Sequence, residues 1–399
     1  YDNVKYFNKS TIKSSEMPID ILATFSERKF GANGFYATPS AINQYEETQG
    51  SLVGVQTVFT KDNITFKPRV YWRRNQDEYV FVRDNPSIYR NLHITNKVGM
   101  ELNTAIQSKW GTTGLGVDVA KVYLSSNNLG DRDRLMGTFF LEHRFLLLDA
   151  KLDITPGLAA NYYTDFDGNI FPGIDVGYQI SKQFRTYANI GKTYRIPTYT
   201  DLYYSDPTTL GNENLKQEEA LSEEIGMVFT KNQFDFTAAF FNRDAKNLID
   251  YTKEEVTDKY QANNIRSLNT KGFEMATNYK YTWFSFVQRI NLGYTFMEDS
   301  IEDIEAAFSR YSINSANHQF TAQWNSQFFK NITQTISYRY VERTSGESYG
   351  IVDANVVMKL KALELSVMAN NIFNATYTET NLVPMPKGNL LFVVKYDFK

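Results

Sequence analysis

The chain of 399 residues contains three histidines and no cysteine, which leaves few side chains for nucleophilic, redox or metal chemistry. His93, His143 and His318 are not spaced as the ligands of one metal ion. A hydrolase needs a nucleophile, a base and an orienting group within mutual reach. Glu142 and Arg144, the sequence neighbours of His143, would point away from it on a strand. The sequence therefore predicts a protein that is not an enzyme.

Two acidic residues could bind a hard cation. Residues 165–169 read DFDGN, which places the carboxylates of Asp165 and Asp167 at alternating positions, as at the start of a calcium loop. An EF-hand also needs Glu at its twelfth position, where this chain has Val176. The alternative is a plain hairpin loop, because Asp, Gly and Asn suit turns. Calcium is the one cofactor that the sequence suggests.

A segment rich in tyrosine is the candidate binding site for a small molecule. Its candidate ligand-binding residues are Tyr199, Tyr203, Tyr204, Asn212 and Asn214. Tyrosine offers a large amphipathic contact surface and loses little entropy when it binds. The alternative is a loop that packs on its own aromatic rings.

The elements that must position these residues are β-strands, because apolar residues recur with a period of two along most of the chain. Between residues 284 and 296, one face carries Phe286, Ile290 and Leu292, and the other carries Arg289 and Thr295. Similar alternation follows at 320–328, 332–340 and 390–398. A soluble sandwich would have shorter strands, about five or six residues long. Long strands with a polar second face favour an outer-membrane barrel, whose apolar face contacts lipid.

The connections support this fold class. About 19 strand-like segments are joined by connections that alternate between short and long. Short turns occur at 61–63, 109–111, 181–183, 231–232, 330–331 and 361–362, and long loops at 30–47, 75–90, 197–217, 250–264, 298–317 and 374–388. We expect an all-β, antiparallel, up-and-down transmembrane barrel of the 22-stranded type. The odd count predicts that about three strands precede Tyr1.

A row of polar side chains would then line the lumen. The predicted lumen-lining residues are Lys67, Arg69, Arg73, His93 and Lys97. They form either a track for an anionic substrate or a contact surface for acidic groups and water. The chain as a whole carries a net charge of −3, which argues against a nucleic-acid partner.

Two segments resemble a known family. Residues 194–204 read YRIPTYTDLYY, and residues 211–216 read GNENLK. Together they resemble the FRxP…NPxL signature of TonB-dependent outer-membrane receptors. Residues 30–36, 45–48 and 369–374 also resemble segments of this family. The resemblance covers essentially the whole chain and implies energy-driven uptake of a nutrient across the outer membrane of a Gram-negative bacterium.

The chain also departs from the family pattern. It lacks the N-terminal plug domain and the TonB box, and Glu213 stands where the signature usually has Pro. Barrels of this family usually end in an aromatic residue, whereas this chain ends in Lys399, one position after Phe398. The resemblance therefore implies that residues 1–399 are the C-terminal part of a transmembrane barrel. Its partners would be outer-membrane lipid, the TonB complex through the missing plug, and a surface lipoprotein over the loops.

The resemblance also suggests a ligand. PTYTDLYY followed by GNxNLK is most similar to cobalamin receptors, which implies a corrinoid. Haem receptors often place a histidine between the two halves of the signature, and none lies between Tyr194 and Lys216. Haem and a ferric siderophore are alternatives within the family. A passive porin and an outer-membrane enzyme are alternatives from other classes, and a plug with a TonB box upstream of Tyr1 would exclude both.

Overall fold

The structure is a computed structural model that describes residues 1–33, 41–302, 308–309, 315–379 and 384–398. These residues form 22 β-strands and one short helix, α1 (Tyr199–Tyr203). No helix in the described ranges is long and apolar enough to cross a membrane.

Most of the strands are long, and their bounds are as follows: β1 (Asp2–Ile12), β2 (Ile19–Gly31), β3 (Tyr45–Thr57), β4 (Phe59–Lys61), β5 (Ile64–Val80), β6 (Arg90–Ser108), β7 (Gly111–Ser126), β8 (Arg132–Leu147), β9 (Leu152–Tyr163), β10 (Asn169–Gln179), β11 (Phe184–Arg195), β12 (Thr209–Leu210), β13 (Glu218–Lys231), β14 (Phe234–Lys253), β15 (Tyr260–Trp283), β16 (Phe286–Glu302), β17 (Phe308–Ser309), β18 (Ala316–Phe329), β19 (Ile332–Arg343), β20 (Ser348–Leu360), β21 (Leu363–Asn370) and β22 (Asn389–Tyr396).

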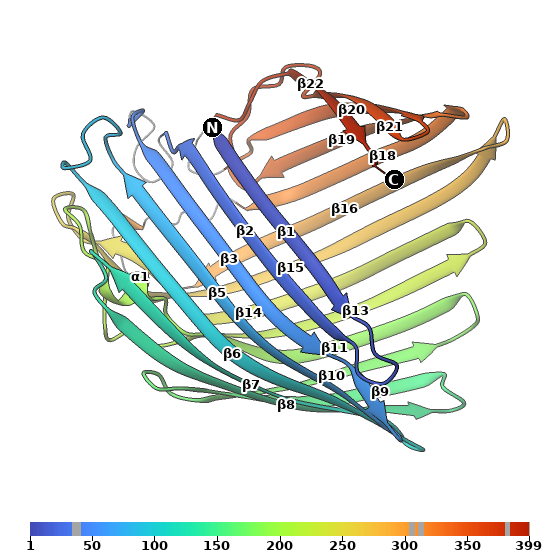
Figure 1. Cartoon of the computed structure of the whole chain (residues 1–399), viewed down its shortest axis with the longest axis horizontal. Helices are drawn as coiled ribbons and strands as arrows, with labels where there is room; N and C mark the ends of the chain where they lie inside the picture. The colour runs from blue at the N-terminus through green and yellow to red at the C-terminus, as the bar shows by residue number, and fades with distance from the viewer. Residues whose placement is uncertain (34–40, 303–307, 310–314, 380–383, 399) are drawn as a thin grey trace.

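The strands form one curled antiparallel sheet. Three strands are short (β4, β12 and β17), and the other 19 form a meander in which each strand pairs with the next long one. The sheet wraps round, so that β1, β2 and β3 cross in front of β15 and β16 (Figure 1). In the described residues, β1 pairs with β2 at one edge and β22 pairs with β21 at the other. The prediction of an all-β antiparallel fold with about 19 strands is confirmed.

The register separates an apolar face from a polar one. Val70 lies opposite Met100, and both are more than half exposed. One residue earlier on β5, Arg69 lies opposite Glu101 and forms an ion pair with it on the other face. Because side chains alternate along a strand, this separation extends across the wall. The apolar face is the one suited to lipid.

Several short turns are closed by residues in the left-handed region. Asp62, Asn232 and Lys361 have φ values of 55°, 54° and 54°. They lie between β4 and β5, β13 and β14, and β20 and β21, where the sequence predicts turns. Left-handed turn residues match the right-handed twist of a hairpin, so these tight turns fix the register of the strands that they join.

Glycines on the polar face accommodate large rings from neighbouring strands. A Cβ atom at Gly99 would lie 2.5 Å from the Tyr71 ring, and one at Gly226 would lie 2.4 Å from the Tyr187 ring. The Tyr71 and Tyr187 rings therefore pack directly on the backbone of these glycines, which have no side chain. This arrangement keeps large aromatic residues on the polar face without filling the space beside it.

The facing assignment predicts different outcomes for two arginine substitutions on β16. Leu292 lies on the apolar face with 41% of its surface exposed, and Thr295 lies on the polar face. An Arg on the lipid face near the bilayer midplane costs about 2–4 kcal/mol. Leu292→Arg should therefore lower the yield of folded barrel, measured by heat-modifiable gel migration, far more than Thr295→Arg. Equal yields for the two variants would reject the assignment of faces.

Candidate functional site

The connection from β11 to β13, residues 196–217, folds across the mouth of the curled sheet, and we call it the mouth segment. It contains α1, which lies at the left rim in Figure 1. Tyr204 Oη lies 2.7 Å from Tyr89 Oη, and Asn128 Nδ2 donates to Ser205 O at 2.8 Å. Tyr89 and Asn128 belong to the connections after β5 and β7, several strands away from β11. The mouth segment therefore crosses the interior, and the polar face that it contacts is the inner one.

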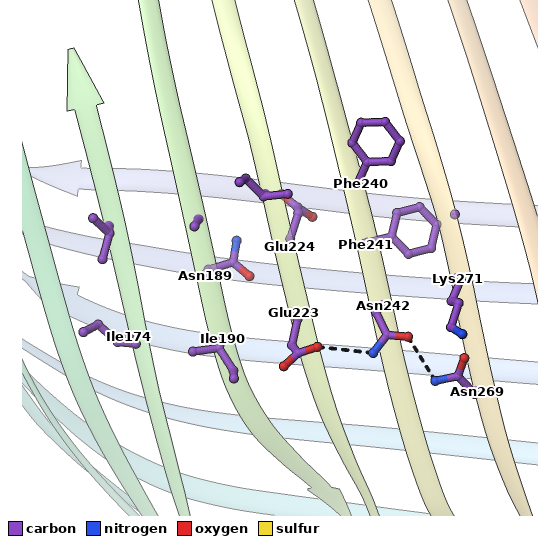
Figure 2. A pocket seen from close by; sticks show the side chains of 14 residues that line it. Ile174, Asn189, Ile190, Glu223, Glu224, Phe240, Phe241, Asn242, Asn269 and Lys271 are labelled. Atoms are coloured by element: carbon purple, nitrogen blue, oxygen red, sulfur yellow. Dashed lines mark hydrogen bonds between the residues drawn. The ribbon is translucent and has the colours of Figure 1, made fainter. Parts of the chain in front are cut away.

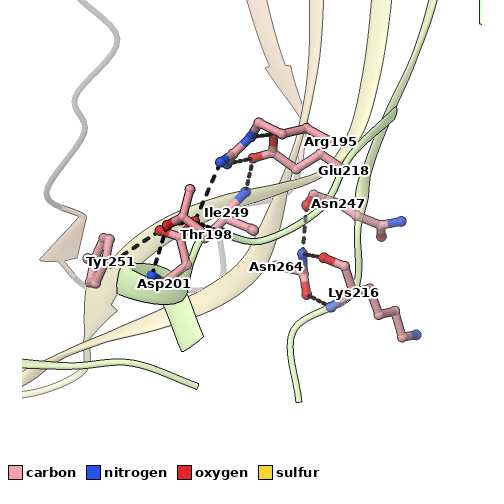
Figure 3. A network of polar contacts seen from close by, with 9 residues as sticks. All are labelled: Arg195, Thr198, Asp201, Lys216, Glu218, Asn247, Ile249, Tyr251 and Asn264. Carbon is pink, nitrogen blue, oxygen red and sulfur yellow. Dashed lines mark hydrogen bonds and ion pairs between the residues drawn. The ribbon is translucent and has the colours of Figure 1, made fainter. Parts of the chain in front are cut away.

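Asp201 holds α1 in place through both carboxylate oxygens. Oδ2 accepts a hydrogen bond from Thr198 N at 2.9 Å, and Thr198 Oγ1 accepts one from Asp201 N at 3.1 Å, which forms a capping box. Oδ1 accepts a hydrogen bond from Tyr251 Oη at 3.2 Å. Arg195 Nη1 approaches Oδ2 at 3.4 Å and also forms a two-point pair with Glu218 (Figure 3). Asp201 thus joins α1 to β11 and β14.

The end of the mouth segment is anchored separately. Asn264 Oδ1 accepts a hydrogen bond from Lys216 N at 2.7 Å, and Asn264 Nδ2 donates to Lys216 O at 2.9 Å (Figure 3). Glu218 Oε1 also accepts from Ile249 N at 2.8 Å. The Lys216 backbone is therefore bonded to β15, and the Glu218 side chain at the start of β13 is bonded to β14.

A small apolar core lies beneath the segment. It consists of Leu202, Leu215, Tyr251 and Ala262, each no more than 5% exposed. Leu202 and Leu215 come from the mouth segment, and the other two come from β14 and β15. Burial of such side chains stabilises the fold by about 1.5–3 kcal/mol for each leucine. The segment is therefore folded onto the wall rather than extended into solvent.

Two arginines at the mouth end of β8 contact the tyrosines of α1. The Arg132 guanidinium lies 3.2 Å from the centroid of the Tyr203 ring, and that of Arg134 lies 4.8 Å from the Tyr199 ring. Cation–π contacts of this kind contribute about 0.5–2 kcal/mol. Sequence reasoning did not find these arginines. Their alternate spacing at the start of a strand was the only signal, and it does not reveal which loop they contact.

Burial keeps the phenols of the mouth segment protonated. Burial, followed by the hydrogen bond with Tyr89, raises the pKa of Tyr204 far above its ordinary value. Burial also raises the pKa of Tyr199. Both hydroxyl groups therefore stay neutral across the physiological pH range, and Tyr204 Oη forms hydrogen bonds whereas Tyr199 Oη is buried without a partner among the described residues.

The five predicted ligand-binding residues lie together but differ in exposure. Tyr199, Tyr203, Tyr204 and Asn212 are half-buried, whereas Asn214 is exposed. Asn212 Nδ2 donates to Ala262 O at 3.0 Å, and Asn212 Oδ1 accepts from Asn214 N at 2.9 Å. The structure thus gives Tyr204 and Asn212 internal partners and leaves the Asn214 side chain and part of Tyr203 on the surface.

The predicted lumen-lining residues share the inner face of β5 and β6. Lys97 lies opposite Arg73 in the register, and its ammonium is 5.6 Å from the Tyr71 ring. Arg69 is paired with Glu101, whereas Lys67 is exposed and lies opposite Asn103. The inner wall therefore carries more positive than negative charge at this place.

His93 lies between an aspartate and a serine, the residue types that form the catalytic triad of many hydrolases. Asp77, His93 and Ser126 lie opposite one another on three adjacent strands, and His93 Nδ1 is 2.7 Å from Ser126 Oγ. Ser126 Oγ, however, also accepts from the backbone N of Asn128 and Leu129, at 3.1 and 2.9 Å. No hydrogen bond joins Asp77 to His93 within the described ranges. Ser126 therefore closes a turn, and the group lacks the relay that a triad requires.

Within the part of the chain that the structure describes, the two candidate calcium ligands, Asp165 and Asp167, do not lie in a cluster of acidic oxygen ligands. Asp165 accepts hydrogen bonds from Arg134 Nε at 2.6 and 2.9 Å, and Asp167 is exposed. Among the described residues, no group of three or more His, Asp or Glu side chains is placed to hold a metal ion. Asp165 thus balances the charge of a nearly buried arginine.

Comparisons with known proteins identify related chains. The family model described as "TonB dependent receptor-like, beta-barrel" matches residues 13–372. The vitamin B12 transporter BtuB of Vibrio vulnificus is 28% identical over 212 residues, which cover 51% of this chain and 32% of BtuB. The ferrienterobactin receptor of Escherichia coli is 24% identical over 165 residues, covering 35% of this chain and 22% of that receptor. The chain thus spans a third or less of these relatives.

Solved structures show the same fold. The FrpB iron transporter of Neisseria meningitidis superposes with a TM-score of 0.80 at 14% identity, covering 99% of this chain and 72% of FrpB. The siderophore receptor PirA of Pseudomonas aeruginosa superposes with a TM-score of 0.73 at 16% identity, covering 94% of this chain and 68% of PirA.

The role of Asp201 gives a direct test of the mouth segment. Asp201→Asn removes the charge from a group with four polar contacts, so the free energy of opening this segment should fall by about 1–3 kcal/mol. Trypsin should then cleave after Lys216 faster than in the wild type. The matched control is Asp167→Asn, at an exposed position, which should leave the rate unchanged. Wild-type cleavage in Asp201→Asn would show that the carboxylate does not hold the segment.

Proposed function

The chain belongs to the TonB-dependent receptor-like β-barrel family, and from this membership we propose that it forms the barrel wall and ligand-binding mouth of a nutrient-uptake receptor. The protein lies in the outer membrane of a Gram-negative bacterium, and its family consists of transport receptors rather than enzymes. The observation that carries the proposal is the mouth segment, which folds over the interior and presents tyrosine and asparagine at its surface.

Transport would depend on a plug domain outside residues 1–399. In this proposal the 399 residues are the C-terminal part of the barrel, and the plug supplies the gate and the contact with the TonB complex. The solved receptors support this division, because the chain covers only 68–72% of PirA and FrpB while nearly all of it superposes on them. A bound ligand would be released into the lumen when energy from TonB displaces the plug.

The ligand that we propose is a corrinoid. A corrinoid is a large, partly apolar disc with amide-bearing arms, which suits an aromatic face such as Tyr203 and amide groups such as Asn214. The vitamin B12 transporters among the relatives support this choice. Haem would call for an axial ligand such as His or Tyr, and for cations to hold its propionates. The mouth segment has no His and carries Asp201, Asp206 and Glu213.

A ferric siderophore is the second candidate. The supporting observation is the basic row on the inner wall, where Lys67, Arg73 and Lys97 face the interior. Such a row attracts an anionic chelate that has passed the mouth. The ferrienterobactin receptor among the relatives is consistent with this candidate.

Titration of the complete receptor separates these candidates. Cyanocobalamin, haemin and ferric enterobactin would each be titrated into wild-type receptor and into the double variant Tyr203→Ala/Asn214→Ala. We expect tight binding of cyanocobalamin and binding about 30- to 900-fold weaker in the variant, because it loses two anchors that each contribute about 1–2 kcal/mol. Tyr162→Ala is the control, since Tyr162 is 58% exposed on the apolar outer face.

Two results would count against the assignment. Tight binding of haemin or ferric enterobactin, with no detectable binding of cyanocobalamin, would overturn the corrinoid. Unchanged cyanocobalamin affinity in the double variant would remove the mouth segment from the binding site.

A further inference from the structure

The first part of the connection from β21 to β22 folds back onto the wall, and we call residues 371–379 the inward arm. The centroid of the Tyr377 ring lies 4.6 Å from that of the Tyr349 ring on β20. At the end of β19, Arg343 Nη2 donates a hydrogen bond to the backbone oxygen of Glu379 at 3.4 Å. The inward arm therefore lies against the mouth ends of β19 and β20.

The inward arm contacts the inner face of these two strands. Ile336 and Val356 are each 42% exposed on the apolar outer face. Arg339 on β19 and Tyr349 on β20 lie an odd number of positions from them, so both side chains point to the interior. Ile351, opposite Arg339 in the register, is only 4% exposed, as expected where the inner wall is covered. Arg339 and Tyr349 therefore meet the inward arm from the lumen wall.

A carboxylate of the inward arm occupies a site for an oxyanion on this wall. Glu379 Oε1 accepts a hydrogen bond from Tyr349 Oη at 3.0 Å, and Arg339 Nη2 lies 3.2 Å from the same oxygen. The side chains of Arg339 and Glu379 are 46% and 31% exposed, so their contact borders open space. Asp353, another acidic group of the inner face, accepts a hydrogen bond from Asn371 N at 2.7 Å. Among the residues that the structure describes, Glu379 is the one carboxylate at ion-pair distance from Arg339.

This site does not depend on an excess of positive charge around it, because it already holds one anion. A guanidinium and a phenol that converge on a single oxygen suit a carboxylate and a phosphate oxygen alike. A ligand that carries an oxyanion can take the place of Glu379 and leave Arg339 with a charged partner. A neutral group cannot do so, because it offers no charge to the guanidinium. The pair therefore favours exchange of one anion for another.

We propose that Arg339 and Tyr349 bind an oxyanion of the ligand, and that Glu379 occupies their site until the ligand displaces it. The inference rests on the proposed function, because it places the ligand at the mouth of the barrel. In a corrinoid such as cyanocobalamin, the oxyanion is the phosphodiester that carries the nucleotide. Glu379 is then an internal competitor, which weakens the apparent affinity by the fraction of receptors whose site is open.

Titration of the complete receptor tests the site with two corrinoids, cyanocobalamin, which has the phosphodiester, and dicyanocobinamide, which lacks it. Glu379→Gln removes the competing charge and keeps the size of the side chain. We expect this variant to bind cyanocobalamin about tenfold more tightly than the wild type and dicyanocobinamide equally well. Adding Arg339→Gln should cancel the gain. A variant that merely loosens the inward arm would not gain affinity for one of the two ligands alone.

The matched control is a hydrogen-bonded carboxylate that does not face the interior. Glu223 Oε2 accepts a hydrogen bond from Asn242 Nδ2 at 3.3 Å, in the wall of the outer hollow that Figure 2 shows. Glu223→Gln should leave the affinity for both corrinoids unchanged. If the receptor binds haemin or ferric enterobactin instead, the same gain in Glu379→Gln and its loss in the double variant are expected for that ligand, which carries propionate or catecholate oxygens.

Hydrogen exchange of the wild-type receptor gives a second measurement that needs no variant. Amides at residues 375–379 should exchange faster in the complex, because the ligand displaces Glu379. Equal or weaker binding of the ligand by Glu379→Gln, or unchanged or slower exchange at residues 375–379, would overturn the inference alone. Failure of cyanocobalamin, haemin and ferric enterobactin to bind would overturn the proposed function and this inference together.

Discussion

Backbone hydrogen bonding is the constraint on which the rest of this structure depends. In hydrocarbon, an unpaired N–H or C=O group has no water to bond, and each such group costs several kcal/mol. A meander of 19 long strands satisfies these backbone groups, because each long strand forms hydrogen bonds with the next long strand along the chain. The same pairing fixes the alternation of faces, which places Leu292 toward lipid and Arg69 toward the interior. The wall is therefore uniform, and specificity must come from the side chains and loops attached to it.

We propose that the mouth segment supplies most of this specificity, and a few polar groups hold it in place. Asp201 joins α1 to β11 and β14, and Asn264 anchors the backbone before β13. Beneath them lies a small apolar core containing Leu202 and Leu215. This combination holds the mouth segment in one conformation through a small number of contacts. In the proposed function, this arrangement would suit a receptor that first holds a ligand and later releases it.

Much of the wall could be predicted from the sequence, because its pattern is local. Alternation over about ten residues identifies each strand, and residues such as Asn232 identify the tight turns. The contacts of the mouth segment could not be predicted in this way. Tyr204 and Tyr89 are 115 positions apart, and Asp165 pairs with Arg134 across 31 positions. Those partners depend on how far the sheet curls and where the segment folds, which no local pattern contains.

The central claim is that the mouth segment is the surface on which the ligand binds. Hydrogen exchange of the complete receptor tests it most directly, with and without whichever of cyanocobalamin, haemin or ferric enterobactin binds. The account predicts that amides between residues 196 and 217 exchange more slowly in the complex, while those in the turn at Asn232 do not change. Tight binding of a ligand with unchanged exchange throughout residues 196–217 would contradict it.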